Sequence, residues 1–241
     1  MGRDKTFKEG AENECPAHRV TISFDFKIGS YPVTQEEFKA LMGYNPSSFI
    51  NCNNSLLRPV DSVTFDEAKS FCQKLTKNLI NEKIINCDSK VSLPGEALWE
   101  YVASLETPFP KKRREMKKIA WYEDNSFDAT HEIGKLAPFP KDIYDLFGNV
   151  LEWCLDSEAP DYRNTPATAT PCIFKGYEKK KIVRGGSWAD LLPLCHKTTR
   201  QSASINMKSK EIGFRCFIVP ADYEPQTFDP PVVEVPDVWD D

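Results

Sequence analysis

The chain has 241 residues and a mass of 27.5 kDa, a size that fits one large domain or two small ones. Charged residues make up 28%, the mean hydropathy is −0.48, and no apolar run reaches the length of a membrane span. We therefore expect a globular protein without a transmembrane helix. Lys and Arg total 31 against 36 Asp and Glu, a net charge of −5. General nucleic-acid binders are basic, so this balance predicts no nucleic-acid partner.

The eight cysteines and three histidines limit the metal chemistry and the location of the chain. There is no C-x-x-C pair and no closely spaced pair of histidines, which excludes a zinc finger or ribbon. Eight cysteines are many for a cytosolic chain of this length, but no apolar signal segment follows Met1. We therefore expect an extracytoplasmic or cell-surface location if a signal was removed, and a cytoplasmic one otherwise.

The first elements are read from residue periodicity. Residues 1–17 are polar and charged and predict a flexible N-terminus. Apolar and polar residues alternate strictly over 20–28, which is typical of a half-buried strand. Thr34 with Glu37 forms a capping-box pattern, which predicts a short helix.

A second group of elements follows a loop at 45–61 that is rich in Asn, Ser and Pro. Thr64 and Glu67 repeat the capping-box pattern before a longer amphipathic helix. A short strand at 91–93 is followed by Pro94, which is favoured at the start of a helix. The first half of the chain therefore predicts three helices and two strands.

Helical periodicity fades beyond residue 105, where residues 111–118 form a basic loop with six Lys and Arg. Four apolar runs then predict a sheet with long loops, at 119–122, 150–155, 181–188 and 212–219. Residues 157–180 are one such loop. Residues 220–241 contain five prolines, seven acids and no Lys or Arg, which predicts a disordered tail. The predicted domain is therefore 18–219, and residues 1–219 carry a charge of +2.

Five segments carry a resemblance to a known family. They are YPVT at 31–34, PVDSVT at 59–64 continuing to Cys72, LPGEALWEY at 93–101, YDLFGNVLEW at 144–153, and RGGSW at 184–188 closed by GFRC at 213–216. Together and in this order they resemble the formylglycine-generating enzyme family, also called the sulfatase-modifying-factor family, over roughly residues 16–219.

The resemblance implies an α+β fold, an irregular and loop-rich variant of the C-type lectin fold with two or three helices around short antiparallel sheets. The founding enzymes of this family oxidise a cysteine of sulfatases to formylglycine with copper and oxygen. Other members, including bacterial variable proteins diversified by retroelements, share the fold and bind ligands. Fold therefore does not decide function. Because residues 1–219 are near neutral, the exclusion of nucleic acid now depends on this resemblance.

The copper pair of the oxidases is incomplete in this chain. In the family, two cysteines lie two and seven residues after the aromatic residue that follows Gly-Gly-Ser. Here that aromatic residue is Trp188, so the two positions are Asp190 and Cys195. A hard carboxylate does not replace a thiolate as a ligand of soft Cu(I). Only Cys195 matches the pair, so we expect no copper and no catalytic residues, with the copper-dependent oxidase as the alternative function.

Two further sites follow from the resemblance. It implies a calcium site, with the hard oxygen ligands that calcium prefers, at Asp145, Gly148, Val150 and Glu152. It also places Cys72 and Cys216 where the family enzymes have a disulfide. The enzymes' other disulfide has Ala103 and Arg200 at its positions and is absent.

We predict that the chain binds a protein, a small molecule or a glycan through the surface built by residues 188–212. These residues lie between two framework motifs, so they can vary without disturbing the strands. The candidate ligand-facing residues are Trp188, Asp190, Leu191, Leu192, His196, Thr198, Gln201, Ser202 and Asn206. A third hypothesis is an interaction subunit that uses the basic loop 111–118 and the acidic tail. The sequence leaves the ligand and the oligomeric state open.

Overall fold

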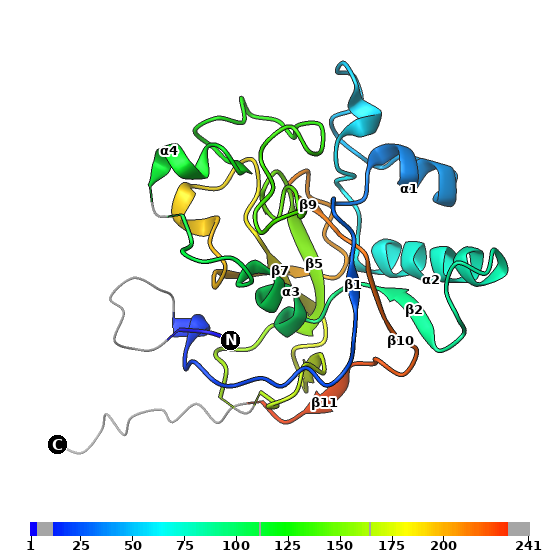
Figure 1. Cartoon of the computed structure of the whole chain (residues 1–241), viewed down its shortest axis with the longest axis vertical. Helices are drawn as coiled ribbons and strands as arrows, with labels where there is room; N and C mark the ends of the chain where they lie inside the picture. The colour runs from blue at the N-terminus through cyan, green and yellow to red at the C-terminus, as the bar shows by residue number, and fades with distance from the viewer. Residues whose placement is uncertain (4–11, 111, 164, 231–241) are drawn as a thin grey trace.

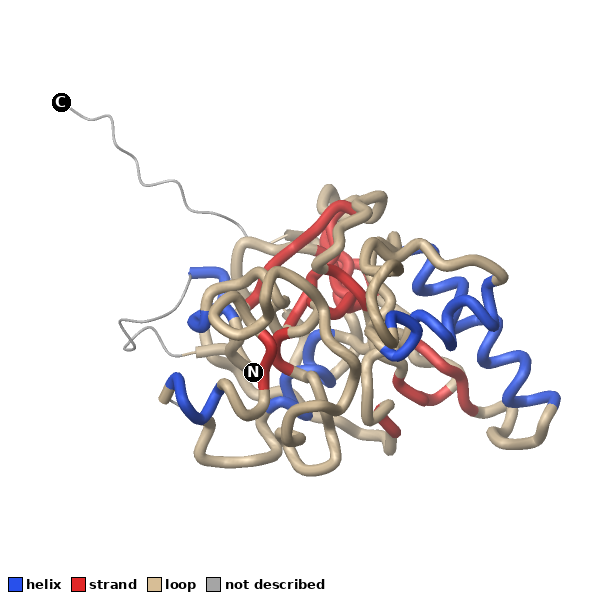
Figure 2. The backbone as a smooth tube through the Cα atoms, turned by 90° about the horizontal axis from the view of Figure 1, so that it is seen from above, coloured by secondary structure: helices blue, strands red, loops and turns tan. Residues whose placement is uncertain are grey.

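A computed structural model gives the fold and describes residues 1–3, 12–110, 112–163 and 165–230. Figure 2 shows that loops make up most of this path and that helical segments lie on both sides of the strands. The helices α1 to α4 are Gln35–Met42, Phe65–Asn81, Glu96–Ala103 and Arg113–Met116. The strands β1 to β11 are Lys27–Ile28, Ser89–Ser92, Ala120–Trp121, Phe147–Gly148, Leu151–Ser157, Cys172–Phe174, Lys180–Arg184, Arg200–Ser204, Ile212–Gly213, Phe217–Pro220 and Gln226–Phe228. Three 3-10 turns, η1 to η3, are Glu12–Glu14, Ser55–Leu57 and Leu192–Leu194.

A four-stranded sheet in the order β8-β7-β5-β9 forms the centre of the molecule. Every residue of β5 is buried, and Figure 1 shows β5 running through the middle of the fold beside α3. β7 is antiparallel to both β5 and β8, whereas β9 is parallel to β5. This sheet positions the predicted binding surface, since β7 ends shortly before residue 188, β8 lies within 188–212 and β9 begins at Ile212.

A smaller antiparallel sheet in the order β1-β10-β2 lies beside α2. The hydroxyl of Thr76 on α2 accepts a hydrogen bond from the Val91 amide on β2 at 2.9 Å, which joins the helix to this sheet. Three other strand pairs are parallel, β3 with β4, β6 with β11 and β5 with β9. The prediction of antiparallel sheets alone was therefore wrong, because long loops bring these strands together in place of hairpins.

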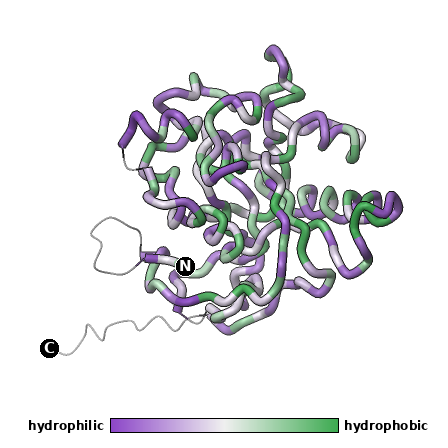
Figure 3. The backbone as a smooth tube through the Cα atoms, viewed as in Figure 1, coloured by the Kyte–Doolittle hydropathy of each residue, from purple (hydrophilic) through white to green (hydrophobic). Residues whose placement is uncertain are grey.

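Both predicted capping boxes are confirmed. The Thr34 hydroxyl accepts from the Glu37 amide at the start of α1, and the Glu37 carboxylate accepts from the Thr34 amide. Thr64 and Glu67 make the same reciprocal pair at the start of α2. Each box satisfies main-chain donors that a helix start leaves without partners. Figure 3 shows polar and apolar residues alternating along α2, as its predicted amphipathic pattern requires.

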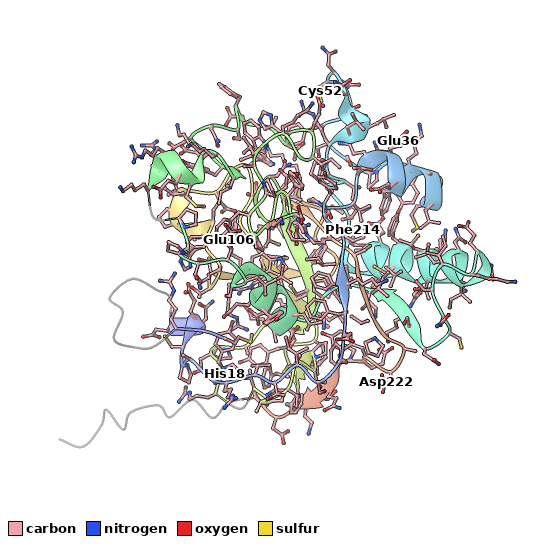
Figure 4. The ribbon with its side chains drawn as sticks, in the orientation of Figure 1. His18, Glu36, Cys52, Glu106, Phe214 and Asp222 are labelled. Atoms are coloured by element: carbon pink, nitrogen blue, oxygen red, sulfur yellow. The ribbon has the colours of Figure 1, made fainter. Side chains whose placement is uncertain are left out.

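The aromatic core lies between these helices and the central sheet. Phe38 of α1 stacks on Phe71 of α2 with ring centroids 5.7 Å apart, and Phe214 packs edge-on against Phe71 at 5.3 Å. All three rings are buried, and Figure 4 labels Phe214 in the interior between α2 and β5. The GFRC motif therefore contributes Phe214 to the core, where its ring packs against α1 and α2.

The predicted strand at 20–28 was mostly wrong. Only β1, at its end, pairs with another strand, and Thr21 makes an isolated bridge to Thr168. The alternation is real, because the even-numbered residues from Val20 to Ile28 pack against the core while the odd-numbered ones face solvent. Periodicity reports the burial of an extended segment, but a strand also needs a neighbour with free main-chain groups.

Several predicted loops and boundaries contain further structure. The loop 157–180 contains β6, and the basic loop contains α4, with Lys111 outside the described residues. The boundary at 219 falls inside β10, and β11 pairs with β6 within the predicted tail, whose residues 231–241 lie outside the described ones. Residues 4–11 of the predicted flexible N-terminus also lie outside, while η1 packs on the body with Glu14 buried. No helix among the described residues is both long and apolar enough to cross a bilayer.

Candidate functional site

Two arginines mark the ends of the loop that contains most of the predicted binding residues. Arg184, the last residue of β7, donates to the Glu100 carboxylate of α3 at 2.6 Å. Arg200, the first residue of β8, forms two hydrogen bonds with the Glu96 carboxylate of α3 at 2.6 and 2.9 Å. All four side chains are buried. The segment 185–199 is therefore held at both ends by one helix.

Gly185 and Gly186 turn the chain from β7 into this loop. Both have positive φ, +99° and +77°, a conformation that favours glycine. A side chain on Gly186 would place its Cβ 2.7 Å from the sulfur of Cys195, and one on Gly185 would come 2.6 Å from the Leu146 carbonyl. The Gly-Gly-Ser motif is thus explained by close packing under the loop.

Asp190 closes the turn that follows. Its carboxylate accepts hydrogen bonds from the main-chain amide and from the hydroxyl of Ser187, both at 2.8 Å. Its main-chain carbonyl accepts from the Glu123 amide at 3.0 Å, and Gln201 on β8 donates to the same carboxylate at 3.5 Å. The residue predicted to face a ligand therefore uses its charged oxygen to fix the shape of the loop.

Cys195 lies beneath the loop with 1% of its surface exposed. Burial raises the pKa of its thiol, and the negative charge of Asp190 raises that pKa further. The side chain is thus a protonated thiol at neutral pH, whereas copper binding and nucleophilic chemistry both need the thiolate. In the absence of a metal, the position that matches the oxidase pair therefore holds a buried, protonated thiol.

Trp188 packs into the surface beside a second loop. Its indole N–H donates to the Lys210 carbonyl at 3.0 Å, and its ring meets Phe49 edge-on with centroids 5.5 Å apart. The Lys210 ammonium lies 4.8 Å from the centre of the ring. Trp188 is buried, so it supports the surface from below, while Ile50, the residue after Phe49 in the chain, is 48% exposed.

The other predicted ligand-facing residues divide into two groups. Leu191 is 61% exposed and Asn206 is exposed, while Leu192, Gln201 and Ser202 are half-buried. Gln201 and Ser202 belong to β8, so their side chains point to opposite faces of the sheet. These five residues remain available at or near the surface.

His196 and Thr198 lie under the N-terminal segment. The Thr198 hydroxyl donates to the Glu14 carboxylate at 2.6 Å, and the guanidinium of Arg3 lies 2.6 Å from Nδ1 of His196. Burial lowers the pKa of His196 to about 4, and the positive charge of Arg3 contributes to this shift. The histidine is therefore neutral at pH 7, and the structure does not join these two residues to the exposed group.

The sequence reasoning missed the neighbours of this loop. Phe49 and Ile50 come from the loop 45–61, where two adjacent apolar residues within a polar segment were an available signal. Glu123 lies in another loop, whose tip carries Phe127 with 86% of its surface exposed. The hydrogen bond from the Glu123 amide to the Asp190 carbonyl links this loop to the segment 185–199, and no sequence pattern predicts it.

The predicted calcium residues surround the start of β5. The Asp145 carboxylate accepts from the Gly134 amide at 2.7 Å and from the Asn149 side chain at 3.2 Å. Glu152 accepts from Trp99 and from Arg215, each at 2.9 Å. Burial raises the pKa of both carboxyl groups, and the charge of Glu152 adds to the rise at Asp145.

The donor set fits calcium by its chemistry, because it combines two carboxylates with main-chain carbonyls, and both supply the hard oxygen ligands that calcium prefers. However, Arg215 already supplies a positive charge to Glu152. Within the described parts of the chain, no group of three or more acidic, His or Cys side chains is arranged to hold a metal. Calcium at this site would therefore have to share Glu152 with Arg215.

The predicted disulfide partners are brought together. The sulfur atoms of Cys72 on α2 and Cys216 after β9 are 3.9 Å apart, and both residues are thiols in this structure. The Cys216 thiol has a raised pKa because of its hydrogen bond with Cys72 and because of burial. The two residues are close enough for oxidation to join them with a small movement.

With the fold and these sites in place, comparison with known proteins gives the family. The model of the sulfatase-modifying factor enzyme 1-like domain matches residues 1–219. The chain belongs to this family. The resemblance drawn from the five motifs is thereby confirmed, and so is the irregular, loop-rich α+β fold.

Individual relatives of this sulfatase-modifying-factor-like chain have different names. The chain is 27% identical over 215 residues to "Chaperone protein LppX" of Paenibacillus barcinonensis, covering 70% of this chain and 71% of that protein. It is 27% identical over 240 residues to "Serine/threonine-protein kinase pkn1" of Chlamydia pneumoniae, covering 86% of this chain but 35% of the kinase. Among solved structures, "Treponema denticola variable protein 1" superposes with a TM-score of 0.75 at 28% identity, covering 91% of each chain.

Proposed function

We propose that this chain is a binding module that takes a protein or other ligand on the surface built by residues 188–212, without oxidase chemistry. The observation that carries the proposal is the pairing of Asp190 with Ser187 above the buried thiol of Cys195. The two positions that hold copper in the oxidases are here a loop-closing carboxylate and a protonated thiol. Both side chains therefore serve the shape of the surface.

The framework under the loop supports this function. Arg184 and Arg200 hold both ends of the segment on α3, and neither of their side chains reaches the solvent. Leu191 and Asn206 lie outside that network and are exposed. A surface whose supports are buried can change its exposed residues without loss of the fold.

The relatives add support to the same proposal. The Treponema denticola structure is called a variable protein, and it is similar to this chain over almost its whole length. We therefore propose that this chain is a variable protein of the kind diversified by retroelements, with its variable residues within 188–212. The Paenibacillus barcinonensis relative is called a chaperone, which favours a protein as the ligand.

A copper titration coupled to a peptide assay tests this proposal. The wild-type chain is expected to show no tight Cu(I) binding and no oxygen consumption with a Cys-x-Pro-x-Arg peptide. The variant Asp190→Cys restores the second thiol position and is expected to bind Cu(I) more tightly than the wild type, whereas Asp190→Asn is the matched control without a thiol. Tight copper binding with peptide turnover by the wild type would contradict the proposal and support the oxidase.

We also propose calcium at Asp145, Gly148, Val150 and Glu152. Burial raises the pKa of both carboxyl groups, the charge of Glu152 raises the pKa of Asp145 further, and a divalent cation at this site would favour their ionised forms. Adding calcium to chelator-treated protein is then expected to raise the midpoint of thermal unfolding. Identical melting curves with chelator and with calcium would instead mean that Arg215 alone neutralises this site.

A further inference from the structure

Strand β8 is an edge strand of the central sheet. Among the described residues, β7 is its one strand partner. Natural sheet edges are usually blocked by charged side chains, by proline or by a bulge. Residues 201–204 of β8 are Gln, Ser, Ala and Ser, and they contain none of these protecting residues.

The register of β8 on β7 shows which main-chain groups face outward. Ile205 donates to the Lys179 carbonyl at 3.0 Å, and the ladder pairs Lys181 with Ala203. Main-chain groups alternate between the two sides of a strand, so Ala203 directs its N–H and C=O toward β7. Ser202 therefore directs both of its main-chain groups toward the free edge.

The groups near Ser202 on this edge are already used. The Arg200 carbonyl accepts from the Asn13 side chain at 3.4 Å, and the Ser204 carbonyl accepts from the Met207 amide at 2.9 Å. The N–H and C=O of Ser202 have no partner in the part of the chain that the structure describes. Its hydroxyl is bonded to Glu158 at 2.7 Å, on the face of the sheet and away from the edge.

We propose that this edge takes an extended peptide segment of a partner protein as an added antiparallel strand. The peptide exchanges two main-chain hydrogen bonds with Ser202, the pattern of a directly opposed pair in an antiparallel ladder. The main chain then supplies affinity, and the side chains of the surrounding loop supply selectivity. This inference depends on the proposed function, because Ser202 lies within the proposed binding segment 188–212.

A proline substitution separates the main chain from the side chain at this position. Ser202→Pro removes the outward N–H, and proline is tolerated on an edge strand where that N–H faces solvent. Ser202→Ala is the matched control, because it removes the hydroxyl and keeps the N–H. The probe is a library of random dodecapeptides displayed on phage and selected on the wild-type chain. Selected peptides are expected to bind Ser202→Ala like the wild type and Ser202→Pro about fivefold more weakly, the loss expected for one hydrogen bond.

A second measurement does not depend on the folding of the proline variant. Amide hydrogen exchange of the wild-type chain is expected to slow at Ser202 when a selected peptide is bound, while the Ala203 amide is slow with and without it. No enrichment of peptides, equal binding to Ser202→Pro, or unchanged exchange at Ser202 would each overturn the proposal. A wild-type dimer that Ser202→Pro dissociates would also overturn it, since the occupant would then be a second copy of this chain.

One further variant distinguishes this inference from the proposed function. Leu191→Glu places a charge on the exposed part of the binding surface and leaves the edge of β8 intact. Peptides that lose binding to Leu191→Glu but not to Ser202→Pro would support the binding surface and overturn strand addition. Peptides unaffected by both variants would contradict both proposals.

Discussion

Arg184 and Arg200 lie directly opposite each other across strands β7 and β8, and each forms an ion pair with a different glutamate of α3. Two like charges this close are stable only because Glu100 and Glu96 neutralise them. The lowered pKa of Glu96 has the same origin, since the charges of Arg200 and Arg184 outweigh the effect of its burial. The segment 185–199 therefore begins and ends in a single charge cluster.

Breaking this cluster is expected to destabilise the whole fold. Arg200→Met leaves the Glu96 carboxylate buried without its closest partner, which costs about 3–5 kcal/mol in comparable buried pairs. Chemical denaturation measures this loss as a lower free energy of unfolding. Lys135→Met, which breaks an exposed pair with Glu132, is the control and is expected to leave the unfolding midpoint unchanged. Equal effects of the two variants would contradict a stabilising role for the cluster.

Removing the Asp190 carboxylate is expected to open the loop. Asp190→Ala loses two hydrogen bonds from Ser187, which corresponds to about 1–3 kcal/mol of stability. Asp190→Asn keeps an acceptor oxygen without the charge and is expected to stay close to the wild type in stability. Both variants remove a charge that raises the pKa of Cys195, and only Asp190→Ala also exposes the thiol. Alkylation of Cys195 followed by mass spectrometry is expected to be fastest in Asp190→Ala, and equal rates in both variants would refute the opening of the loop.

The stability of the fold is expected to depend on His196 below neutral pH. Its pKa in the folded protein is about 4, and the ordinary value is 6.5. Between these values the unfolded chain binds more protons at this residue, so its contribution to stability falls as the pH falls from 6.5 to 4. Urea denaturation across this range is expected to give a shallower decline for His196→Gln than for the wild type.

Asp156 acts in the opposite direction over nearly the same range. Burial raises its pKa to about 6 from 3.8, so the folded chain binds more protons between these values and gains stability as the pH falls. The pH dependence of the wild-type free energy of unfolding is therefore the sum of two opposing contributions, from His196 and from Asp156. Parallel curves for the wild type and His196→Gln would show that the histidine does not titrate as its burial requires.

Oxidation is expected to join Cys72 and Cys216. The bond would link residues 144 positions apart in the sequence, and the chain-entropy estimate for a loop of this length is about 4–5 kcal/mol. A mild oxidant is therefore expected to raise the thermal midpoint of the wild type and not that of Cys216→Ala. Cys87→Ser, at an exposed cysteine, is the control and is expected to respond like the wild type. An increase that persists in Cys216→Ala would assign the effect to another pair of thiols.

Local sequence patterns predicted the elements that depend on near neighbours. Both capping boxes and the apolar face of α2 were correct, because their contacts join residues within one or two helical turns. The family motifs predicted the fold of the domain as a whole, which these local patterns did not. The proximity of Cys72 and Cys216 came from the resemblance and from no local pattern.

The features that sequence reasoning missed depend on residues far apart in the chain. Glu96 and Arg200 are separated by 104 positions, and no periodicity connects them. The fixed role of Thr198 was missed for the same reason, since its partner Glu14 is 184 positions away. Asp190 is the exception, because its partner Ser187 is three residues away. A polar side chain between two motifs looks free to bind a ligand until its partner within the fold is known.

The contact between Gly186 and Cys195 has a consequence for the chemical durability of the surface. The missing side chain lets the main chain close over the sulfur, with only 1% of the cysteine exposed. Peroxides attack accessible thiolates first, and this sulfur is neither accessible nor ionised. The loop 185–199 is thus shielded from oxidative damage at Cys195, and a bulkier residue at 186 would remove this shielding together with the turn.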